Sequence, residues 1–206
     1  MRLTVFIPLL LVLVCGGNAW AERKPPLPQT GLKIAKAARS QVGVTTHYDP
    51  AYVALSYPGG DVPRTRGVCT DVVIRALRSL GIDLQSLIHE DMARAFRLYP
   101  SLWGHRGPDK NIDHRRVPNI ARFMERKGKA VPLSSSPEGF HAGDFVVTRL
   151  DSGLIHIMVV SERKTRSGVP LVIHNVGAGT REEDALFAYK NEGLYRWFPI
   201  ASPSQP

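Results

Sequence analysis

Hydrophobic and polar positions follow two different periods along this chain, and the change falls near residue 140. In the first part, apolar residues recur at spacings of three and four, which is typical of amphipathic helices. The segments concerned are residues 31–43, 70–81, 84–96 and 117–128. Thr30 and Asp83 precede the first and third segments, where a short polar side chain caps a helix. The first part of the chain is therefore predicted to be helical.

The last third of the chain changes to short runs of β-branched and aromatic residues separated by turn residues. These predicted strands are residues 144–150, 154–161, 170–176 and 194–200. Their short connections favour antiparallel pairing, because parallel strands need long crossovers. Helices followed by strands predict an α+β fold, with N-terminal helices packed on an antiparallel sheet of about four to six strands.

The N-terminus has the pattern of a secretory signal peptide over residues 1–21. Arg2 is followed by an apolar run, and Ala19-Trp20-Ala21 is a small-x-small cleavage signal. We expect cleavage near Ala21 and a periplasmic or secreted protein. No stable membrane anchor is expected, because Val14 stands before Cys15, where lipidation signals usually have a small residue.

The predicted domain organisation follows from composition. Residues 22–30 are a Pro-rich lead-in, residues 31–200 form a single domain, and residues 201–206 are a disordered tail. The chain has 27 basic and 18 acidic residues, a net charge of +9, which becomes +8 without the signal peptide. This charge favours anionic partners. Long Lys/Arg runs are absent from the sequence, so nucleic-acid binding is not expected. We expect a monomer.

Cys69 is the residue that raises a chemical question. The sequence has two cysteines, and removal of the signal peptide takes away Cys15, so Cys69 has no partner for a disulfide within the mature chain. A free cysteine is either a small buried hydrophobe or a reactive nucleophile. A helix starting at Cys69 would favour the thiolate through the helix dipole. Arg64 and Arg66 would add to that effect, whereas Asp71 would oppose it.

Two histidines interrupt the apolar runs of neighbouring predicted strands. His156 lies within residues 154–161, and His174 ends an apolar run that begins at Pro170. Polar breaks in a hydrophobic pattern often mark functional sites. If the two strands pair as a hairpin, both rings can face the same side of the sheet. A thiol nucleophile needs such an imidazole and a group that orients it.

The order of these residues resembles that of the NlpC-type cell-wall cysteine peptidases of the papain-like superfamily. The resemblance rests on a cysteine at a helix start, Gly143-Asp144 before a strand, and the two strand histidines. It implies a papain-like fold in which Cys69 is the nucleophile, His156 the general base and His174 the orienting residue. The mature chain also resembles the YijF-like bacterial family of unknown function, through the segments "YPGGDVP", "CTDVVIRAL", "NIDHRRVPN" and "HNVGAGT".

Further residues are candidates for the same site. Tyr57 precedes Gly59-Gly60 and is a candidate oxyanion donor beside the backbone N–H of Cys69. Asn175 competes with His174 as the residue that orients His156, because one residue of strand register decides between them. NlpC-type enzymes usually have Asp-Cys-Ser at the nucleophile, whereas this chain has Val68-Cys69-Thr70, which puts the substrate in doubt.

A charged cluster before the fourth helix is a candidate clamp for substrate carboxylates. Its members are Asp113, His114, Arg115 and Arg116. Arginine binds carboxylates through two parallel hydrogen bonds, and peptidoglycan stems carry several carboxylates. Asp71, next to the thiol, is added to this group of substrate-site candidates. The same loop also fits a solvated basic segment with local Asp–Arg pairing.

The functional expectation is an exported cysteine hydrolase that cleaves amide bonds of peptidoglycan peptides through a Cys-His-His triad. The substrate class comes from the resemblance alone. One alternative is a non-catalytic module that binds cell-wall peptides. Another is a zinc hydrolase that uses Cys69, His156 and His174 as ligands. Neither HExxH nor paired CxxC occurs in the sequence, so we expect no metal and no cofactor.

Overall fold

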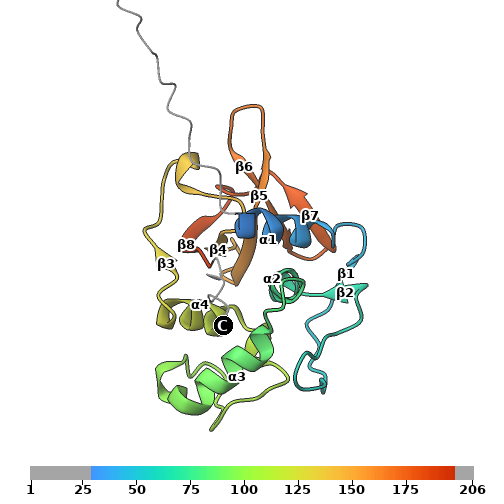
Figure 1. Ribbon diagram of the computed structural model, residues 1–206, viewed down its shortest axis with the longest axis vertical. Coiled ribbons are helices and arrows are strands. Elements are labelled where there is room, and N and C mark those ends of the chain that lie inside the picture. Colours follow the sequence, from blue (N-terminus) through green and yellow to red (C-terminus); the bar gives the residue numbers. More distant parts are fainter. Residues whose placement is uncertain (1–28, 198–206) are drawn as a thin grey trace, which may run out of the picture.

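A computed structural model describes residues 29–197 of the chain, and Figure 1 shows its arrangement of helices and strands. The helices are α1 (Gln29–Arg39), α2 (Cys69–Arg78), α3 (Leu84–Ala95) and α4 (Val117–Arg126), with 3-10 turns η1 (Phe96–Leu98), η2 (Asp113–Arg115) and η3 (Pro137–Gly139). The strands are β1 (His47–Tyr48), β2 (Arg66–Gly67), β3 (Ala130–Val131), β4 (Phe145–Arg149), β5 (Ile155–Lys164), β6 (Pro170–Asn175), β7 (Thr180–Glu183) and β8 (Lys190–Tyr195). The predicted α+β class is confirmed.

Several predicted segments lie outside the described residues. They are the signal peptide (1–21), nearly all of the Pro-rich lead-in (22–28 of 22–30), the last residues of the predicted fourth strand (198–200) and the tail (201–206). None of the helices within residues 29–197 combines the length and the apolar composition that a bilayer-spanning helix requires.

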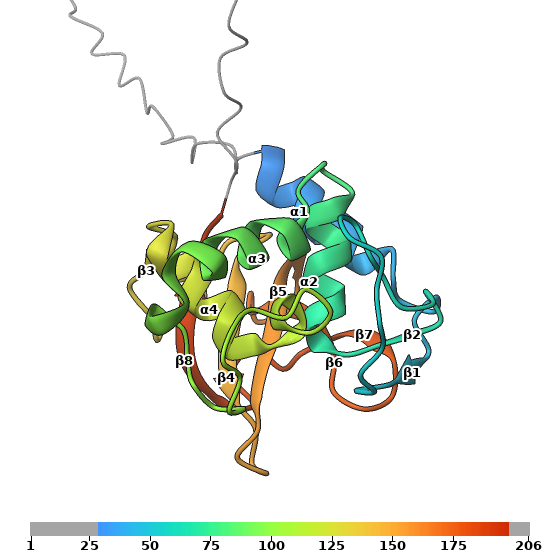
Figure 2. The ribbon, with the colours of Figure 1, turned by 90° about the horizontal axis from the view of Figure 1, so that it is seen from below.

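The main sheet has six strands in the order β3-β8-β4-β5-β6-β7, and every neighbouring pair is antiparallel. This confirms the predicted antiparallel sheet. The short parallel pair β1–β2 was not predicted, nor were β3 and β7. Figure 2 shows β1 and β2 beside β7, where the N–H of Thr180 donates to the carbonyl of Thr45 at 2.7 Å.

Alternating side chains give the sheet two buried faces with different coverings. All four helices contribute to the cluster on one face, and Figure 1 shows α2, α3 and α4 gathered on one side of the strands. The β4 and β5 residues on this helix face are Phe145, Val147, Ile157 and Val159. Those on the opposite face are Val146, Met158 and Val160, which pack with Val172, Leu186 and Leu194.

The helix starts explain how the sequence fixes the local structure. Asp83 caps α3 as predicted, because its side chain accepts from the N–H of Gln85 at 3.2 Å. The prediction that Thr30 caps the first helix was wrong, since α1 already includes Gln29 and Thr30. The second helix begins at Cys69, which places the thiol at its N-terminus.

Candidate active site

The N-terminus of α2 is built around Asp71. Val68 has extended backbone geometry (φ −117°, ψ −176°), and its N–H donates to the Asp71 carboxylate at 2.7 Å. The preceding residue, Gly67, has φ +159°, and a Cβ there would lie 2.9 Å from Asp71 Oδ2. The turn therefore requires a glycine beside the capping carboxylate, and the cap fixes Cys69 as the first helical residue.

The Cys69 thiol is buried, with 6% of the residue exposed. The pKa of Cys69 is raised to about 11, because burial and the Asp71 charge, which raise it, outweigh the backbone N–H groups of Ile157, Thr70 and Cys69 itself, which lower it. The expectation that the helix start lowers the thiol pKa was wrong, because desolvation outweighs the backbone dipoles. The resting thiol is neutral at neutral pH.

The two strand histidines lie on one face of the sheet, as predicted. His156 Nε2 and His174 Nδ1 are 2.9 Å apart, and the residues are 3% and 1% exposed. His156 lies opposite Thr148 and two residues before Met158, which puts both rings on the face away from the helices. Burial and, to a smaller extent, His174 lower the pKa of His156 to about 3. Both the thiol and the candidate base are therefore neutral at rest.

The backbone of β5 links the thiol to His156. The N–H of Ile157 stabilises the Cys69 thiolate, and its nitrogen is bonded to the carbonyl carbon of His156. Strand N–H groups point in the plane of the sheet. Strands β5 and β6 pair up to Val159–Ile173, and beyond that pair β6 stays paired with β7. The thiol therefore lies against the backbone of Ile157, at the edge of β5 where β6 no longer pairs with it. The His156 ring projects from the neighbouring residue onto the other face of the sheet, and its Nδ1 is not used in the bond to His174.

His174, and not Asn175, is the hydrogen-bond partner of His156. The side chain of Asn175 has the opposite direction on β6, where its amide nitrogen donates to the carbonyl of Gly67 at 3.0 Å. A longer contact of 3.4 Å joins the same nitrogen to the carbonyl of His47. Asn175 therefore holds the backbone of β1 and β2 just before the nucleophile, and its expected competition with His174 for His156 is resolved by the strand register.

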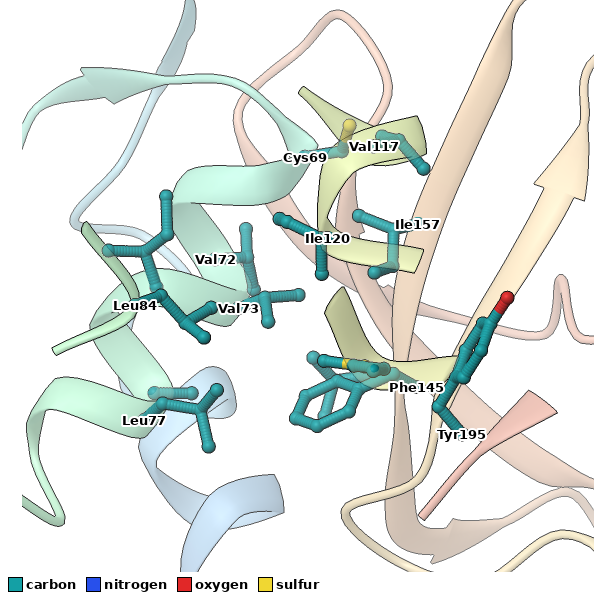
Figure 3. Packing of buried hydrophobic residues seen from close by; sticks show 14 of the residues in the cluster. Cys69, Val72, Val73, Leu77, Leu84, Val117, Ile120, Phe145, Ile157 and Tyr195 are labelled. Carbon is teal, nitrogen blue, oxygen red and sulfur yellow. The ribbon is translucent and has the colours of Figure 1, made fainter. Parts of the chain in front are cut away.

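A cavity of about 400 Å³ opens at Cys69 on the helix side of the sheet. Figure 3 shows Cys69 at the start of α2 beside Val117 of α4, which also lines this cavity. Trp103 and Leu154 form apolar parts of its wall. Arg115, Arg116 and Arg149 also line it, whereas none of the described lining residues is Asp or Glu. The cavity is thus lined by apolar side chains and arginines, and Cys69 is part of this lining.

Tyr48, and not Tyr57, is the tyrosine beside the thiol. Tyr48 lines the cavity, and burial raises its pKa, with Cys69 and Asp71 raising it further. It therefore stays protonated and can donate a hydrogen bond. The Tyr57 ring lies 5.2 Å from the ring of His89, away from the described lining of this cavity. The assignment of Tyr57 as oxyanion donor is corrected on this ground. No motif surrounds Tyr48, so the sequence held no signal for it.

Asp71 and Arg115 form a buried ion pair. Asp71 does not line the cavity, so its expected role in substrate binding is corrected, whereas Arg115 both lines the cavity and binds Asp71. Arg115 Nε and Nη2 lie 3.0 and 2.9 Å from the two carboxylate oxygens of Asp71, and the side chains are 2% and 3% exposed. Arg115 also donates to the carbonyls of Ala51 (3.2 Å) and Asp49 (3.3 Å). The pair therefore ties the loop after Tyr48 to the start of α2.

The other members of the charged cluster are either enclosed in the protein or line the cavity. Asp113 accepts from the N–H of Asp109, and His114 is 2% exposed, with a pKa that burial lowers to about 4. Both are enclosed, so their assignment to substrate binding is corrected as well. Arg116 lines the cavity: its guanidinium is 3.9 Å from the ring centre of Trp103, and Nη2 is 3.1 Å from His105 Nε2. Arg116 is the cluster residue best placed to meet a ligand.

Within residues 29–197, no group of three His, Cys, Asp or Glu side chains is placed to hold a metal ion. The zinc alternative needs the ring nitrogens of His156 and His174 to point at one ion together with the Cys69 sulfur. In the structure, His156 Nε2 and His174 Nδ1 instead face each other.

Comparison with known proteins gives three findings. Residues 35–197 match a family described as Domain of unknown function (DUF1287). A protein of Escherichia coli strain K12, described as "Uncharacterized protein YijF", is 53% identical over 197 residues, which cover 92% of this chain and 96% of that protein. The solved structure of NlpC1 from Trichomonas vaginalis is 14% identical and has a TM-score of 0.43. It matches 81% of this chain, which spans 43% of the NlpC1 chain.

Proposed function

The chain belongs to the DUF1287 family, whose description assigns no activity, and we propose that it is a cysteine hydrolase that cleaves amide bonds of cell-envelope peptides. One observation carries this proposal. The Cys69 thiol opens into a cavity of about 400 Å³ and lies against the backbone N–H that follows His156. A nucleophile and a space for an acyl group therefore lie together, and the proposed base, His156, is the neighbour of Ile157 in β5.

The proposed reaction uses His156 as general base. Its Nδ1 takes the proton from Cys69 Sγ while the sulfur attacks the carbonyl carbon of a bound amide. The backbone N–H of Cys69 and the hydroxyl of Tyr48 are the proposed donors to the oxyanion. The proton on His156 then passes to the leaving amine, which departs as the carbon–nitrogen bond breaks. Water, activated by the same ring, releases the acid from the thioester.

The proposed substrates are peptidoglycan peptides that carry carboxylates. Three arginines line the cavity, and two of them already have carboxylate partners: Arg115 binds Asp71, and Arg149 binds Glu192 at 2.7 Å. Arg116 has a longer contact of 3.6 Å to Asp113 and is the arginine best able to receive an anionic substrate group. The predicted signal peptide and the resemblance to NlpC-type peptidases support a periplasmic or secreted enzyme, which we propose acts as a monomer.

Digestion of purified peptidoglycan tests this proposal. Soluble fragments released by the wild type and by Cys69→Ala are compared by mass spectrometry. We expect fragments from the wild type that differ by hydrolysis of one amide bond, and none from Cys69→Ala. Equal release by both proteins would exclude the thiol mechanism. Activity that chelation abolishes and zinc restores would replace it with the metal-dependent alternative.

A non-catalytic peptide-binding module is the second candidate, and the neutral resting thiol favours it. A pKa of about 11 for Cys69 means that the free protein holds little thiolate at neutral pH. A binding module would retain peptidoglycan equally well as the wild type and as Cys69→Ala, and neither protein would release fragments. Pull-down with insoluble peptidoglycan, run on the same samples as the digestion, separates the two functions.

A further inference from the structure

A carboxylate faces the far side of the histidine pair, and no step of the proposed reaction uses it. We propose that Glu183 is a positioning residue that sets the tautomers of His174 and His156, so that His156 presents an unprotonated Nδ1 to the thiol. This inference rests on the proposed cysteine-hydrolase function for its catalytic meaning. The arrangement of the three side chains carries it.

The geometry forms a line across three strands on the face away from the helices. His156 Nε2 is 2.9 Å from His174 Nδ1, and His174 Nε2 is 3.7 Å from Glu183 Oε2. In β7, Glu183 pairs with Val172 of β6, which belongs to the same face as His174. The chain of groups therefore runs from β5 through β6 to β7.

His174 Nε2 is the buried nitrogen of the pair that lacks a hydrogen-bond partner within the described residues. The Glu183 carboxylate nevertheless lies nearby. Burying a polar atom without a hydrogen-bond partner costs free energy. Such an atom therefore usually marks a catalytic site or a place where side chains rearrange. At 3.7 Å the contact is longer than the ~2.7–2.9 Å of a charge-assisted hydrogen bond. Glu183 is 38% exposed in its side chain and can close the gap by rotation.

Hydrogen-bond rules then determine both tautomers. A neutral imidazole has one donor nitrogen and one acceptor nitrogen. With Glu183 as acceptor, His174 carries its proton on Nε2 and leaves Nδ1 as acceptor. His156 must therefore carry its proton on Nε2, and its Nδ1 keeps a lone pair for the thiol proton. The opposite arrangement would protonate His156 Nδ1 and remove the base.

The neighbouring charges agree with this orientation. Arg181 lies opposite His174 on β7, and its Nη1 is 3.6 Å from Glu183 Oε1, so the two carboxylate oxygens face different partners. When His156 takes the thiol proton, the new positive charge lies two groups from Glu183 and is stabilised through His174. Glu183 itself does not touch the substrate or the thiol.

The decisive experiment measures tautomers directly, by ¹⁵N NMR of the histidine rings in the folded full-length protein. We expect the wild type to carry the Nε2 proton on both rings. Glu183→Leu, which has no acceptor, is expected to shift the tautomer ratio at His174 by at least about threefold, whereas Glu183→Gln, which keeps an acceptor oxygen, changes it less. Glu182→Leu is the matched control, because Glu182 pairs with Ile173 and lies on the helix face.

Peptide hydrolysis provides the second readout. For Glu183→Leu we expect kcat to fall about tenfold with KM unchanged, a smaller loss than removing a direct partner of a catalytic histidine causes. Unchanged ring tautomers in Glu183→Leu, or the same shift in Glu182→Leu, would overturn the proposal. The tautomer shift is measured without substrate, so it still supports the positioning role if the wild type releases no fragments. That second result would instead defeat the proposed hydrolase.

Discussion

Two polar networks, one at the start of α2 and one on the opposite face of the sheet, differ in how completely their groups are paired. On the helix face, Asp71 accepts from Val68 and from two nitrogens of Arg115, which also binds two carbonyls of the loop after Tyr48. On the opposite face, the His156–His174 pair ends at a buried nitrogen with no hydrogen-bond partner within the described residues. The saturated network holds the thiol in place, whereas the unsaturated one keeps groups that can gain or lose a proton.

A substitution in the histidine network should have the largest effect on activity. His156→Ala removes the proposed base and should lower the turnover of a peptidoglycan peptide by about 10² to 10⁴-fold. Steady-state release of the free amine measures this loss. His47→Ala, at an exposed histidine of β1, is the control. A variant that keeps more than half of the wild-type turnover would show that His156 is not the base.

A substitution in the network at the start of α2 should have the largest effect on stability. Arg115→Met leaves the Asp71 charge buried without its partner, and loss of one member of a buried ion pair costs about 3–5 kcal/mol. The free energy of unfolding in urea measures this. Arg163→Met is the matched control, because Arg163 is 61% exposed in its pair with Glu182, and an exposed pair contributes at most about 1 kcal/mol. Equal losses in the two variants would remove the contrast between the faces.

Mild acid should destabilise the fold through its buried histidines. Burial lowers the pKa of His156 to about 3 and that of His114 to about 4, from an ordinary value of 6.5. Below pH 6.5 the unfolded chain takes up protons that the folded chain does not. As the pH falls from roughly 6 to 4.5, each of these histidines therefore lowers the free energy of unfolding by about 1.4 kcal/mol per pH unit.

Urea unfolding at a series of pH values tests this slope. In His156→Ala, one buried histidine is gone, and the decline should flatten by about the contribution of one group. Carboxylates begin to titrate at the lower end of this range, but they are the same in both proteins, so the difference in slope reports on His156. An identical slope in the wild type and in the variant would mean that His156 is not held neutral in the fold.

The smallest predicted effect concerns the charge of the cavity at Cys69. Arg116→Gln should lower the ratio of Cys69 alkylation by anionic iodoacetate to that by neutral iodoacetamide by about two- to fivefold at low salt. Arg163 is not among the described residues that line the cavity, so Arg163→Gln should leave the ratio unchanged. A ratio that is the same in all three proteins would show that Arg116 does not attract anions to the thiol.

The long helices and the core strands could be predicted from the sequence, whereas the short strands could not. Helices of ten to twelve residues and the core strands carry a clear hydrophobic period. The strand β7 has the sequence TREE, which is polar throughout and lacks a period, so nothing distinguishes it from a loop. It pairs with β6 because the neighbouring strand offers hydrogen bonds, a tertiary effect that overrides local composition.

The site shows the same division. The two histidines could be predicted because they interrupt apolar runs, and their shared face follows from strand alternation. Tyr48 was missed because it stands in a long loop without a motif. Arg115 was misread because a sequence does not say whether a charged residue faces solvent or a buried partner. The thiol pKa was misjudged for a related reason: the helix dipole can be predicted from sequence, whereas the depth of burial depends on how the whole fold packs.

The rate of Cys69 alkylation by iodoacetamide, measured at pH 7 in folded wild type and folded His156→Ala, tests the central claim most directly. We predict that the wild-type thiol reacts in the folded state, because His156 Nδ1 accepts its proton, and that the variant reacts at least about tenfold more slowly. Both proteins should react equally fast once they are unfolded in urea. Equal rates in the two folded proteins, or a wild-type thiol that reacts only after unfolding, would contradict a catalytic pair of Cys69 and His156.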